Sequence, residues 1–523
     1  MTEPRPPEEA SAPSRRVYFA LAAGIVLTLL LRIPAFQFPL DQDCGEYSYC
    51  AMRWAAGGLP YRDVWDHKPP LIYLVYRGIF AVAGSGPAIV APALRVGAML
   101  CDAATALALF ALVRRLFGAW QGVAAATAFG LFSGMPGMQL EAFQPERLTT
   151  LFAALGLLAT SSYVRSWRYR HAALAGLWLG LGVAAKQIAA PIGLLAWAWA
   201  TAEALRAHGR QAWGRVAAHS GLMAAGAALP WALFAGYFAL RGAFADFWEC
   251  TYTYNVLYAT EHRKGALLDQ LRRLVTTKLF DHAFLWLTAA GGILLAVRRP
   301  AERRGGLVVL AWVLAAFLGL FLPGQFAHYY YLPTLAPLAA ASAVALAALG
   351  QLGRAPGLRR LVAAGLGMAL LALLAFAAKR GAGEYRLAVD PKQPNQVVAR
   401  LARDLAAKTA PSDHIFLFGG RPQIYALAGR PASTKYLFNF SYQVPLAKAF
   451  LFQDAVRAEI MAGLQQHPPR FVIVAITEKR ELEGFPELAD HLAAHFTEQP
   501  EWRAKVDEPH TYVLRVFRRK TAP

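Results

Sequence analysis

Charged residues and cysteines are both scarce in this 523-residue sequence. Only 16% of the residues are Asp, Glu, Lys or Arg, whereas 56% are hydrophobic and the mean hydropathy is +0.33. A water-soluble protein of this size cannot bury so much apolar surface, and the same composition excludes intrinsic disorder. Four cysteines are too few for a disulfide-rich scaffold or a cysteine-rich zinc module. The composition therefore indicates an integral membrane protein.

About 20 apolar residues cross a bilayer as a helix, and long Leu, Ala and Val runs lack the alternation of a β-barrel strand. The sequence predicts about eleven membrane helices. They cover residues 17–36, 92–113, 119–134, 148–164, 172–186, 188–203, 217–240, 282–297, 306–322, 331–350 and 360–378. No cleavage pattern of small residues follows the first run, so we expect residues 1–16 to stay as a cytoplasmic tail.

Arginines are distributed unevenly between the loops that this topology creates. The short loops on the cytoplasmic side carry clusters such as Arg165, Arg168 and Arg170, whereas the short outer loops carry only Arg147. This asymmetry obeys the positive-inside rule. It also explains the net charge of +20 without nucleic acid, which we do not expect as a partner.

Two long loops, residues 37–91 and 241–281, fall on the outer side. The first contains an amphipathic stretch from Leu71 to Gly84 that is interrupted by Arg77. We expect it to lie on the outer membrane surface, because a true span there would invert the arginine pattern. The membrane domain thus covers residues 17–378, and its odd number of spans places the C-terminal tail outside.

The tail, residues 395–523, alternates helix-like and strand-like segments. Helices are predicted at 395–408 and 444–465, and strands at 415–418 and 471–476. The strand FVIVAI is apolar on both faces, which suits a sheet covered on both sides. The predicted fold is an α-helical polytopic membrane protein with a small extracytoplasmic α/β domain.

Acidic and basic residues gather in the first long loop. They are Asp41, Asp43, Glu46, Asp63, Asp66, Arg53, Arg62, His67 and Lys68, with Tyr47 and Tyr61 among them. Such a set can bind a substrate with a charged head and an apolar tail, although a solvated loop with ordinary ion pairs is the alternative. On a helix, Asp43, Glu46 and Tyr47 share one face, where a carboxylate can act as a general base. Asp41 and Asp43 alternatively offer oxygen ligands for a divalent cation.

Four further residues are candidates for the site: Glu146, like Glu46, as a supporting acid of catalysis, and Lys186, Arg263 and His328 for substrate contacts. Glu146 either occupies a favourable first helical turn or lines the same outer cavity. Lys186 either extends to the membrane surface or binds phosphate. Arg263, in the second long loop, is a candidate for lipid phosphates, and His328 for a hydrogen bond to the substrate beside interfacial tyrosines.

Cys44, Cys50 and Cys250 all map to the outer side. A disulfide among them requires an oxidising compartment, and the sequence selects no pairing. Cys101 is expected to be a small core residue within a helix.

The first-loop string resembles a known superfamily. Asp43-x-x-Glu46-Tyr47, Gly57-Gly58-Leu59-Pro60-Tyr61, Asp63 and His67-Lys68-Pro69-Pro70 resemble the GT-C membrane glycosyltransferases, and within them bacterial relatives of the protein O-mannosyltransferases. These include the lipid A aminoarabinose transferase and the galacturonosyl transferases of the lipopolysaccharide core. Residues 145–152, 185–187 and 330–340 match later patterns more loosely, and the likeness covers roughly residues 17–350.

This resemblance implies an inner-membrane enzyme that transfers a sugar from a polyprenyl-phosphate donor to a lipid, glycan or protein acceptor on the outer side, with inversion. Asp43 falls at the family's catalytic carboxylate, and Tyr47 keeps its spacing. Lys68 falls near the donor phosphate, and Glu146 where relatives commonly carry Asp. His67 replaces the Glu usual in the aminoarabinose branch. We expect no required cofactor, since Lys and Arg can steady a monophosphate.

Three other functions are compatible with the same composition. A transporter or flippase requires ionisable groups near the middle of the membrane, whereas the predicted spans are nearly free of charge. A polymerase or ligase of lipid-linked glycans shares the topology but uses a diphosphate donor, which favours a metal at Asp41 and Asp43. A membrane receptor or an assembly scaffold is an alternative function only if the first long loop forms no pocket.

Overall fold

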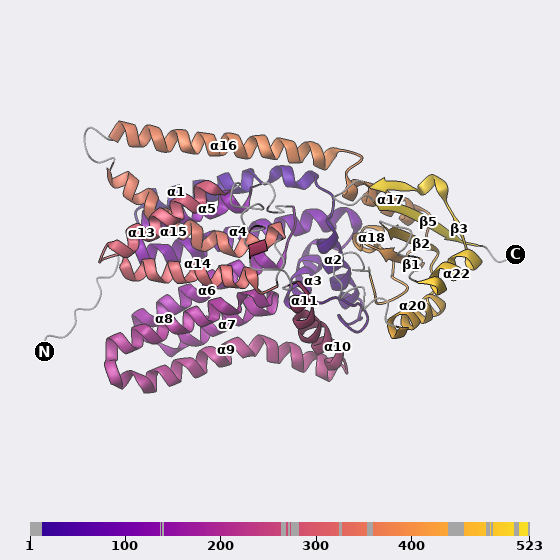
Figure 1. Ribbon diagram of the computed structural model, residues 1–523, viewed down its shortest axis with the longest axis horizontal. Coiled ribbons are helices and arrows are strands. Elements are labelled where there is room, and N and C mark those ends of the chain that lie inside the picture. Colours follow the sequence, from indigo (N-terminus) through magenta and orange to yellow (C-terminus); the bar gives the residue numbers. More distant parts are fainter. Residues whose placement is uncertain are drawn as a thin grey trace.

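The computed structural model describes residues 13–135, 138, 141–262, 268–269, 272, 282–323, 327–352, 359–437, 454–476, 482, 485–506 and 512–520. All eleven predicted apolar segments fall on helices. These are α1 (Arg15–Leu30), α4 (Pro87–Phe117), α5 (Ala119–Ser133), α6 (Pro145–Ser166), α7 (Tyr169–Ala185), α8 (Ala190–His208), α9 (Trp213–Leu240), α13 (Ala283–Arg298), α14 (Arg303–Phe321), α15 (Leu332–Leu352) and α16 (Arg359–Val389). Figure 1 shows them running side by side along the long axis of the molecule.

Several of these helices have the length and the surface of membrane helices. Five stretches of the described residues are long and apolar enough to cross a bilayer: Arg15–Gln37, Pro87–Phe117, Gln187–Leu240, Arg303–Phe321 and His328–Leu349. Their outward faces carry exposed leucines, among them Leu100, Leu194, Leu233 and Leu314. So large an apolar surface is stable against lipid and not against water. The protein is therefore a multi-pass membrane protein.

Small residues and prolines shape the bundle. α4 and α6 each begin at a proline, which fits the first helical turn because its missing N–H has no partner there. In α7, a Cβ atom on Gly176 would lie 2.1 Å from the Met223 carbonyl oxygen of α9. Glycine at this position therefore lets the two helices approach closely, as is common between membrane helices.

The spans are not free of charge, which corrects the prediction. α4 carries Arg95 and Asp102, and both are buried. Arg32 lies 2.8 Å from Asp102, and Arg147 at the start of α6 pairs with the same carboxylate. Arg95 donates a hydrogen bond of 3.1 Å to the Phe36 carbonyl. These charges are compensated by one another or by backbone oxygens, as buried charges must be.

The two long loops form helices between the bundle and the C-terminal sheet (Figure 1). A 3₁₀ turn (Ile33–Gln37) leads into the first loop, which contains α2 (Gln42–Ala55) and α3 (Leu71–Ala83). α3 coincides with the amphipathic helix predicted for Leu71–Gly84. The second loop contains α10 (Phe244–Trp248), a π-helix (Glu249–Thr253) and α11 (Tyr254–His262). A π-helix is rare and is frequently found at functional sites.

The tail folds as a mixed sheet with helices around it. The strands are β1 (Ile415–Gly419), β2 (Phe471–Ile476), β3 (Phe496–Glu498), β4 (Ala504–Val506) and β5 (Tyr512–Arg519), in the order β1-β2-β5-β3, with β4 paired to β5. β1 and β2 are parallel, and the other pairs are antiparallel. The helices are α17 (Pro394–Ala407), α18 (Gln423–Ala428), α20 (Asp454–Gln466) and α22 (Pro486–His495). β1 and residues 471–475 of β2 are buried, as their apolar sequences predict. Of the helix predicted at 444–465, residues 444–453 lie outside the described residues.

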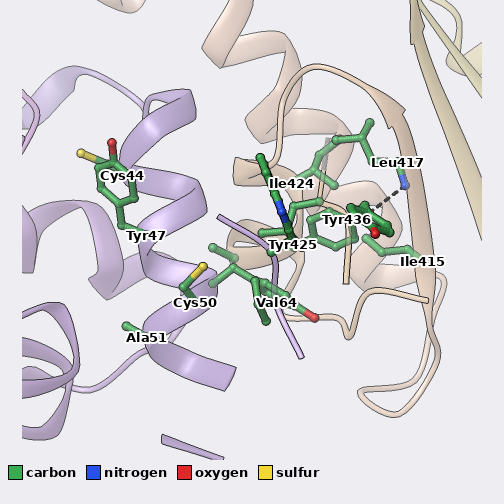
Figure 2. Packing of buried hydrophobic residues seen from close by; sticks show 14 of the residues in the cluster. Cys44, Tyr47, Cys50, Ala51, Val64, Ile415, Leu417, Ile424, Tyr425 and Tyr436 are labelled. Atoms are coloured by element: carbon green, nitrogen blue, oxygen red, sulfur yellow. Dashed lines mark hydrogen bonds between the residues drawn. The ribbon is translucent and has the colours of Figure 1, made fainter. Parts of the chain in front are cut away.

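The sheet domain packs directly on the first long loop. Figure 2 shows Cys50 of α2, together with Val64, facing Ile424, Tyr425 and Tyr436 of the tail. Two hydrogen bonds cross this contact. The Tyr49 hydroxyl accepts from the Ala432 N–H at 2.7 Å, and the Trp65 N–H donates to the Lys435 carbonyl at 2.9 Å. The tail therefore holds the loop that carries the candidate site residues.

We expect one added methyl group at Gly45, where α2 contacts α18, to destabilise the protein. A Cβ atom on Gly45 would lie 2.1 Å from Cβ and 2.3 Å from Cα of Gln423, so Gly45→Ala should force the two elements apart and lower stability by about 1–3 kcal/mol. Thermal unfolding of the purified protein measures the loss. Gly78→Ala in α3 is the matched control, because nothing lies within 4 Å of its added Cβ. Equal melting temperatures for both variants would contradict this packing.

Candidate active site

A cavity of about 410 Å³ lies where the first long loop, the second long loop and the membrane helices meet. Its polar end is formed by His67, Lys68 and Lys186, and its apolar side by Ile188, Val256, Leu322 and Pro323. Two ammonium groups beside an apolar wall suit a ligand with an anionic head and a hydrocarbon tail.

Lys186 is held by a buried ion pair. It ends α7, and its ammonium group pairs with Glu146 in the first turn of α6. Its Nζ also lies 3.6 Å from the ring centroid of Tyr330, a cation–π contact. Glu146 is fully buried, and its Oε2 has no hydrogen-bond partner among the described residues. Lys186 therefore points into the protein and does not extend to the membrane surface.

Lys68 is oriented by its neighbours in the sequence. Its Nζ lies 2.7 Å from His67 Nε2, and because an ammonium group only donates, this ring nitrogen accepts. The other ring nitrogen, Nδ1, lies 3.4 Å from an Asp66 oxygen. Asp66 in turn accepts from the His67 N–H at 2.5 Å and from the Tyr73 hydroxyl at 2.7 Å. The three consecutive side chains thus form a chain of contacts that ends at the cavity.

The backbone of this segment is fixed from two sides. Asn255 of α11 donates to the His67 carbonyl at 2.7 Å, and the Tyr61 hydroxyl donates to the Lys68 carbonyl at 2.8 Å. Asn255 also donates to the Thr251 carbonyl, which belongs to the π-helix. Tyr61 has φ +74°, a strained backbone for a bulky residue that the surrounding packing must support. Tyr61 therefore positions Lys68 and does not line the cavity described here.

Asp43 occupies the first turn of α2 and is partly buried. Its Oδ2 accepts from the Tyr329 hydroxyl at 2.9 Å and from the Gln144 amide at 3.4 Å. Tyr329 adjoins Tyr330, the ring beside Lys186, so the carboxylate lies near the polar end of the cavity. Asp41 is the N-cap of α2 and accepts from the Cys44 N–H at 3.1 Å.

The other site residues predicted from the sequence lie at several places around Asp43 and the cavity, or outside the described residues. Glu46 and Tyr47 face inward from α2 and are buried, and burial with Asp43 nearby raises the pKa of the Tyr47 hydroxyl. His328 is exposed and is not among the described residues that line the cavity. Arg263 lies outside the described residues. From the sequence, Asp66 was named only as one of the charged residues of the first long loop, and neither Asn255 nor Tyr329 was selected for the site.

No cluster of three or more His, Cys, Asp or Glu side chains able to hold a metal occurs in the described part of the chain. One oxygen of Asp41 is already committed to capping α2. All four cysteines are buried and unbonded to one another, so the disulfide among Cys44, Cys50 and Cys250 that the sequence left open is not formed in this structure.

We expect Lys186→Met to lower stability by about 3–5 kcal/mol, because it leaves the buried Glu146 carboxylate without its counter-charge. Adding Glu146→Gln should restore most of the loss. The melting temperatures of the single and double variants in detergent measure the coupling. Additive losses in the double variant would contradict a buried ion pair.

Residues 67–231 match the family described as dolichyl-phosphate-mannose-protein mannosyltransferase. Known structures with the same fold include ArnT from Cupriavidus metallidurans bound to undecaprenyl phosphate, with a TM-score of 0.60 and 15% identity over 96% of this chain and 98% of that chain. They also include the oligosaccharyltransferase AglB from Archaeoglobus fulgidus, in complex with an inhibitory peptide and a dolichol-phosphate, with a TM-score of 0.53 and 15% identity over 95% of this chain and 74% of that chain.

No curated protein sequence matches the chain. The resemblance seen in the first long loop is nevertheless confirmed at the level of the fold, since both structural relatives are GT-C glycosyltransferases. The chain has the GT-C membrane glycosyltransferase fold, and its residues 67–231 match the mannosyltransferase family within it.

Proposed function

We propose that this protein is a membrane glycosyltransferase that moves a sugar from a polyprenyl-phosphate donor to a hydroxyl group of a lipid, glycan or protein acceptor. The cavity with its two lysines, its apolar wall and the carboxylate of Asp43 nearby is the observation that carries the proposal. The relatives support the donor class, because ArnT is bound to undecaprenyl phosphate and AglB to a dolichol-phosphate.

In the proposed reaction, the oxygen of the acceptor hydroxyl attacks the anomeric carbon of the donor sugar, and Asp43 takes the proton from that hydroxyl. The bond between that carbon and the phosphate oxygen breaks, and the electron pair leaves with the phosphate. Attack from the side opposite to the phosphate inverts the anomeric configuration. A positioned carboxylate contributes about 10²–10⁴-fold to such a step.

Lys68 and Lys186 stabilise the negative charge that develops on the departing phosphate. Both lie at the polar end of the cavity, and Lys186 is buried, so water screens their fields less than at an open surface. The apolar wall formed by Val256, Leu322 and Pro323 suits the first isoprene units. Holding donor and acceptor at one membrane surface adds effective molarity.

We place this cavity on the outer side of a bacterial inner membrane, with residues 1–16 in the cytoplasm and the sheet domain in the periplasm. The distribution of arginines supports this orientation. The buried charges of the spans do not favour a transport pathway, since Arg32 and Arg147 already pair with Asp102.

Asp43→Asn should reduce transfer by at least about 10²-fold, because the amide cannot accept the acceptor proton. Mass spectrometry of envelope glycans and lipids measures this in a deletion strain that expresses each variant. The wild-type chain restores the missing sugar, and Asp43→Asn at equal expression does not. Asp490→Asn, which neutralises an exposed carboxylate of the sheet domain, is the control and should restore it fully. Full restoration by Asp43→Asn would remove Asp43 from the mechanism.

Transfer should persist in EDTA, because Lys68 and Lys186 supply the positive charge that a metal provides in diphosphate-dependent enzymes. Incorporation of sugar into acceptor is measured in isolated membranes before and after chelation. Loss of activity that returns with Mg²⁺ or Mn²⁺ would contradict the metal-free reaction and favour a cation at Asp41 and Asp43.

A further inference from the structure

A second cavity, of about 720 Å³, lies on the surface of the bundle between α13 and α15. It shares no described lining residue with the candidate active site. We call it the α13–α15 groove. α15 lines one side with Ala345, Ala348 and Leu349. The residues that line the other side, along α13 and at its end, are Phe284, Leu287, Thr288, Gly291, Leu295 and Arg299.

The groove follows α13 along almost its whole length. Its lining positions recur every three or four residues, which places them on one face of the helix. Residues 284–299 advance about 22 Å along the axis, compared with about 30 Å for the whole hydrocarbon core of a bilayer. Leu287 is 75% exposed, so this face is open to the surrounding lipid. The length of the groove therefore suits a hydrocarbon chain that lies along the helices.

The two helices are in close contact beside the groove. A Cβ atom on Gly292 would overlap the Ala341 carbonyl oxygen, so a glycine is needed where the helices touch. The Thr288 hydroxyl donates to the Ser342 hydroxyl at 2.9 Å. The single hydroxyl group among the described lining residues thus has its partner in the protein. Apart from Arg299, the walls of the groove therefore favour an apolar ligand.

The charged end of the groove is formed by Arg299, which is the C-cap of α13. Its side chain is 36% exposed, and it lies 3.4 Å from Glu302. Such a partly exposed ion pair contributes little to stability, so a phosphate group can replace the carboxylate as the partner of the guanidinium. Residues 298–304 contain four arginines and one glutamate, and therefore carry a net charge of +3.

This charged end is remote from the candidate active site. α14 begins at Arg303, in the same turn, and its 19 residues end at Phe321, just before Leu322 and Pro323 of the first cavity. A helix of that length extends about 28 Å. Arg299 therefore cannot reach the phosphate of a donor lipid whose head lies in the first cavity.

We propose that the α13–α15 groove binds an anionic phospholipid of the membrane leaflet opposite the candidate active site. One acyl chain lies along α13, and the headgroup phosphate contacts Arg299. Basic pockets between membrane helices bind anionic headgroups in this way, and one basic residue near the membrane surface corresponds to roughly fivefold in affinity. Because the lipid contacts both α13 and α15, its binding stabilises the folded protein by mass action.

Native mass spectrometry of the full-length protein in detergent tests the headgroup preference. The probes are phosphatidylglycerol, which is anionic, and phosphatidylcholine with the same acyl chains, which is zwitterionic. The wild type should bind its first phosphatidylglycerol roughly fivefold or more tightly than its first phosphatidylcholine, and Arg299→Gln should lose this preference. Arg206→Gln is the matched control and should keep it. Arg206 also pairs with a glutamate three residues away, Glu203, and Arg304 lies 4.0 Å from that glutamate, at the same end of the bundle.

A second variant fills the groove without removing a charge. A Cβ atom on Gly291 would meet no atom of the described residues within 4 Å, so Gly291→Leu should melt like the wild type in lipid-free detergent. It should nevertheless lose both the preference for phosphatidylglycerol and the rise in melting temperature that this lipid gives the wild type. Gly221→Leu in α9 is the control, because its Cβ is equally unobstructed and it does not line the groove, and it should keep both.

Equal affinity of the wild type for the two phospholipids would overturn the proposal. A preference that survives in Arg299→Gln or in Gly291→Leu, or that is lost equally in the two controls, would also overturn it. Undecaprenyl phosphate that displaces the bound phosphatidylglycerol at equal concentration would assign the groove to the carrier lipid instead, and would contradict the proposal as well. None of these measurements uses sugar transfer, so they stand apart from the proposed function.

Discussion

Compensation of buried charge beside an apolar bilayer is the constraint on which the rest of the structure depends. A substrate with a phosphate head and a hydrocarbon tail needs cations in a site with little water, and an isolated buried cation is costly. The protein meets both demands locally. Lys186 has Glu146 and the face of Tyr330, and Lys68 has His67, whose other ring nitrogen lies beside Asp66. Each cation is thus stabilised before a ligand arrives, and both lysines line the cavity.

The fold makes this arrangement by bringing together segments that are far apart in the sequence. α2 supplies Asp43, the loop before α3 supplies Lys68, the ends of α6 and α7 supply Glu146 and Lys186, and the turn before α15 supplies Tyr329. The sheet domain then fixes the first long loop through the contacts at Gly45, Tyr49 and Trp65. In Figure 1, α2, α3 and α11 lie between the bundle and the sheet, and the cavity is built where the two long loops meet the membrane helices.

Much of the fold could be predicted because membrane helices and buried strands are local patterns. Each apolar run became a helix, the amphipathic stretch became α3, and the FVIVAI segment became a buried parallel strand. The charged residues of the spans were misjudged, because hydropathy averaged over a window hides single residues such as Asp102. Its partners are Arg32, in the turn after α1, and Arg147 of α6, and only the tertiary structure reveals the pairing.

Several residues of the candidate site could be predicted from the sequence, but the contacts among them could not. The first-loop motif pointed to Asp43 and Lys68, and a lysine at the end of an apolar run drew attention to Lys186. The roles of Asn255 and Tyr329 depend on contacts across 188 and 286 residues of sequence, respectively, for which no local pattern exists. Tyr61 looked like a substrate contact and instead supports the Lys68 backbone.

The most direct test of the central claim is an electron cryo-microscopy map of the full chain in lipid nanodiscs with undecaprenyl phosphate. The account predicts phosphate density between the ammonium groups of Lys68 and Lys186, with the lipid chain along Val256, Leu322 and Pro323 and the Asp43 carboxylate facing the same space. Phosphate density elsewhere, with this cavity filled by protein or separated from Asp43, would contradict it.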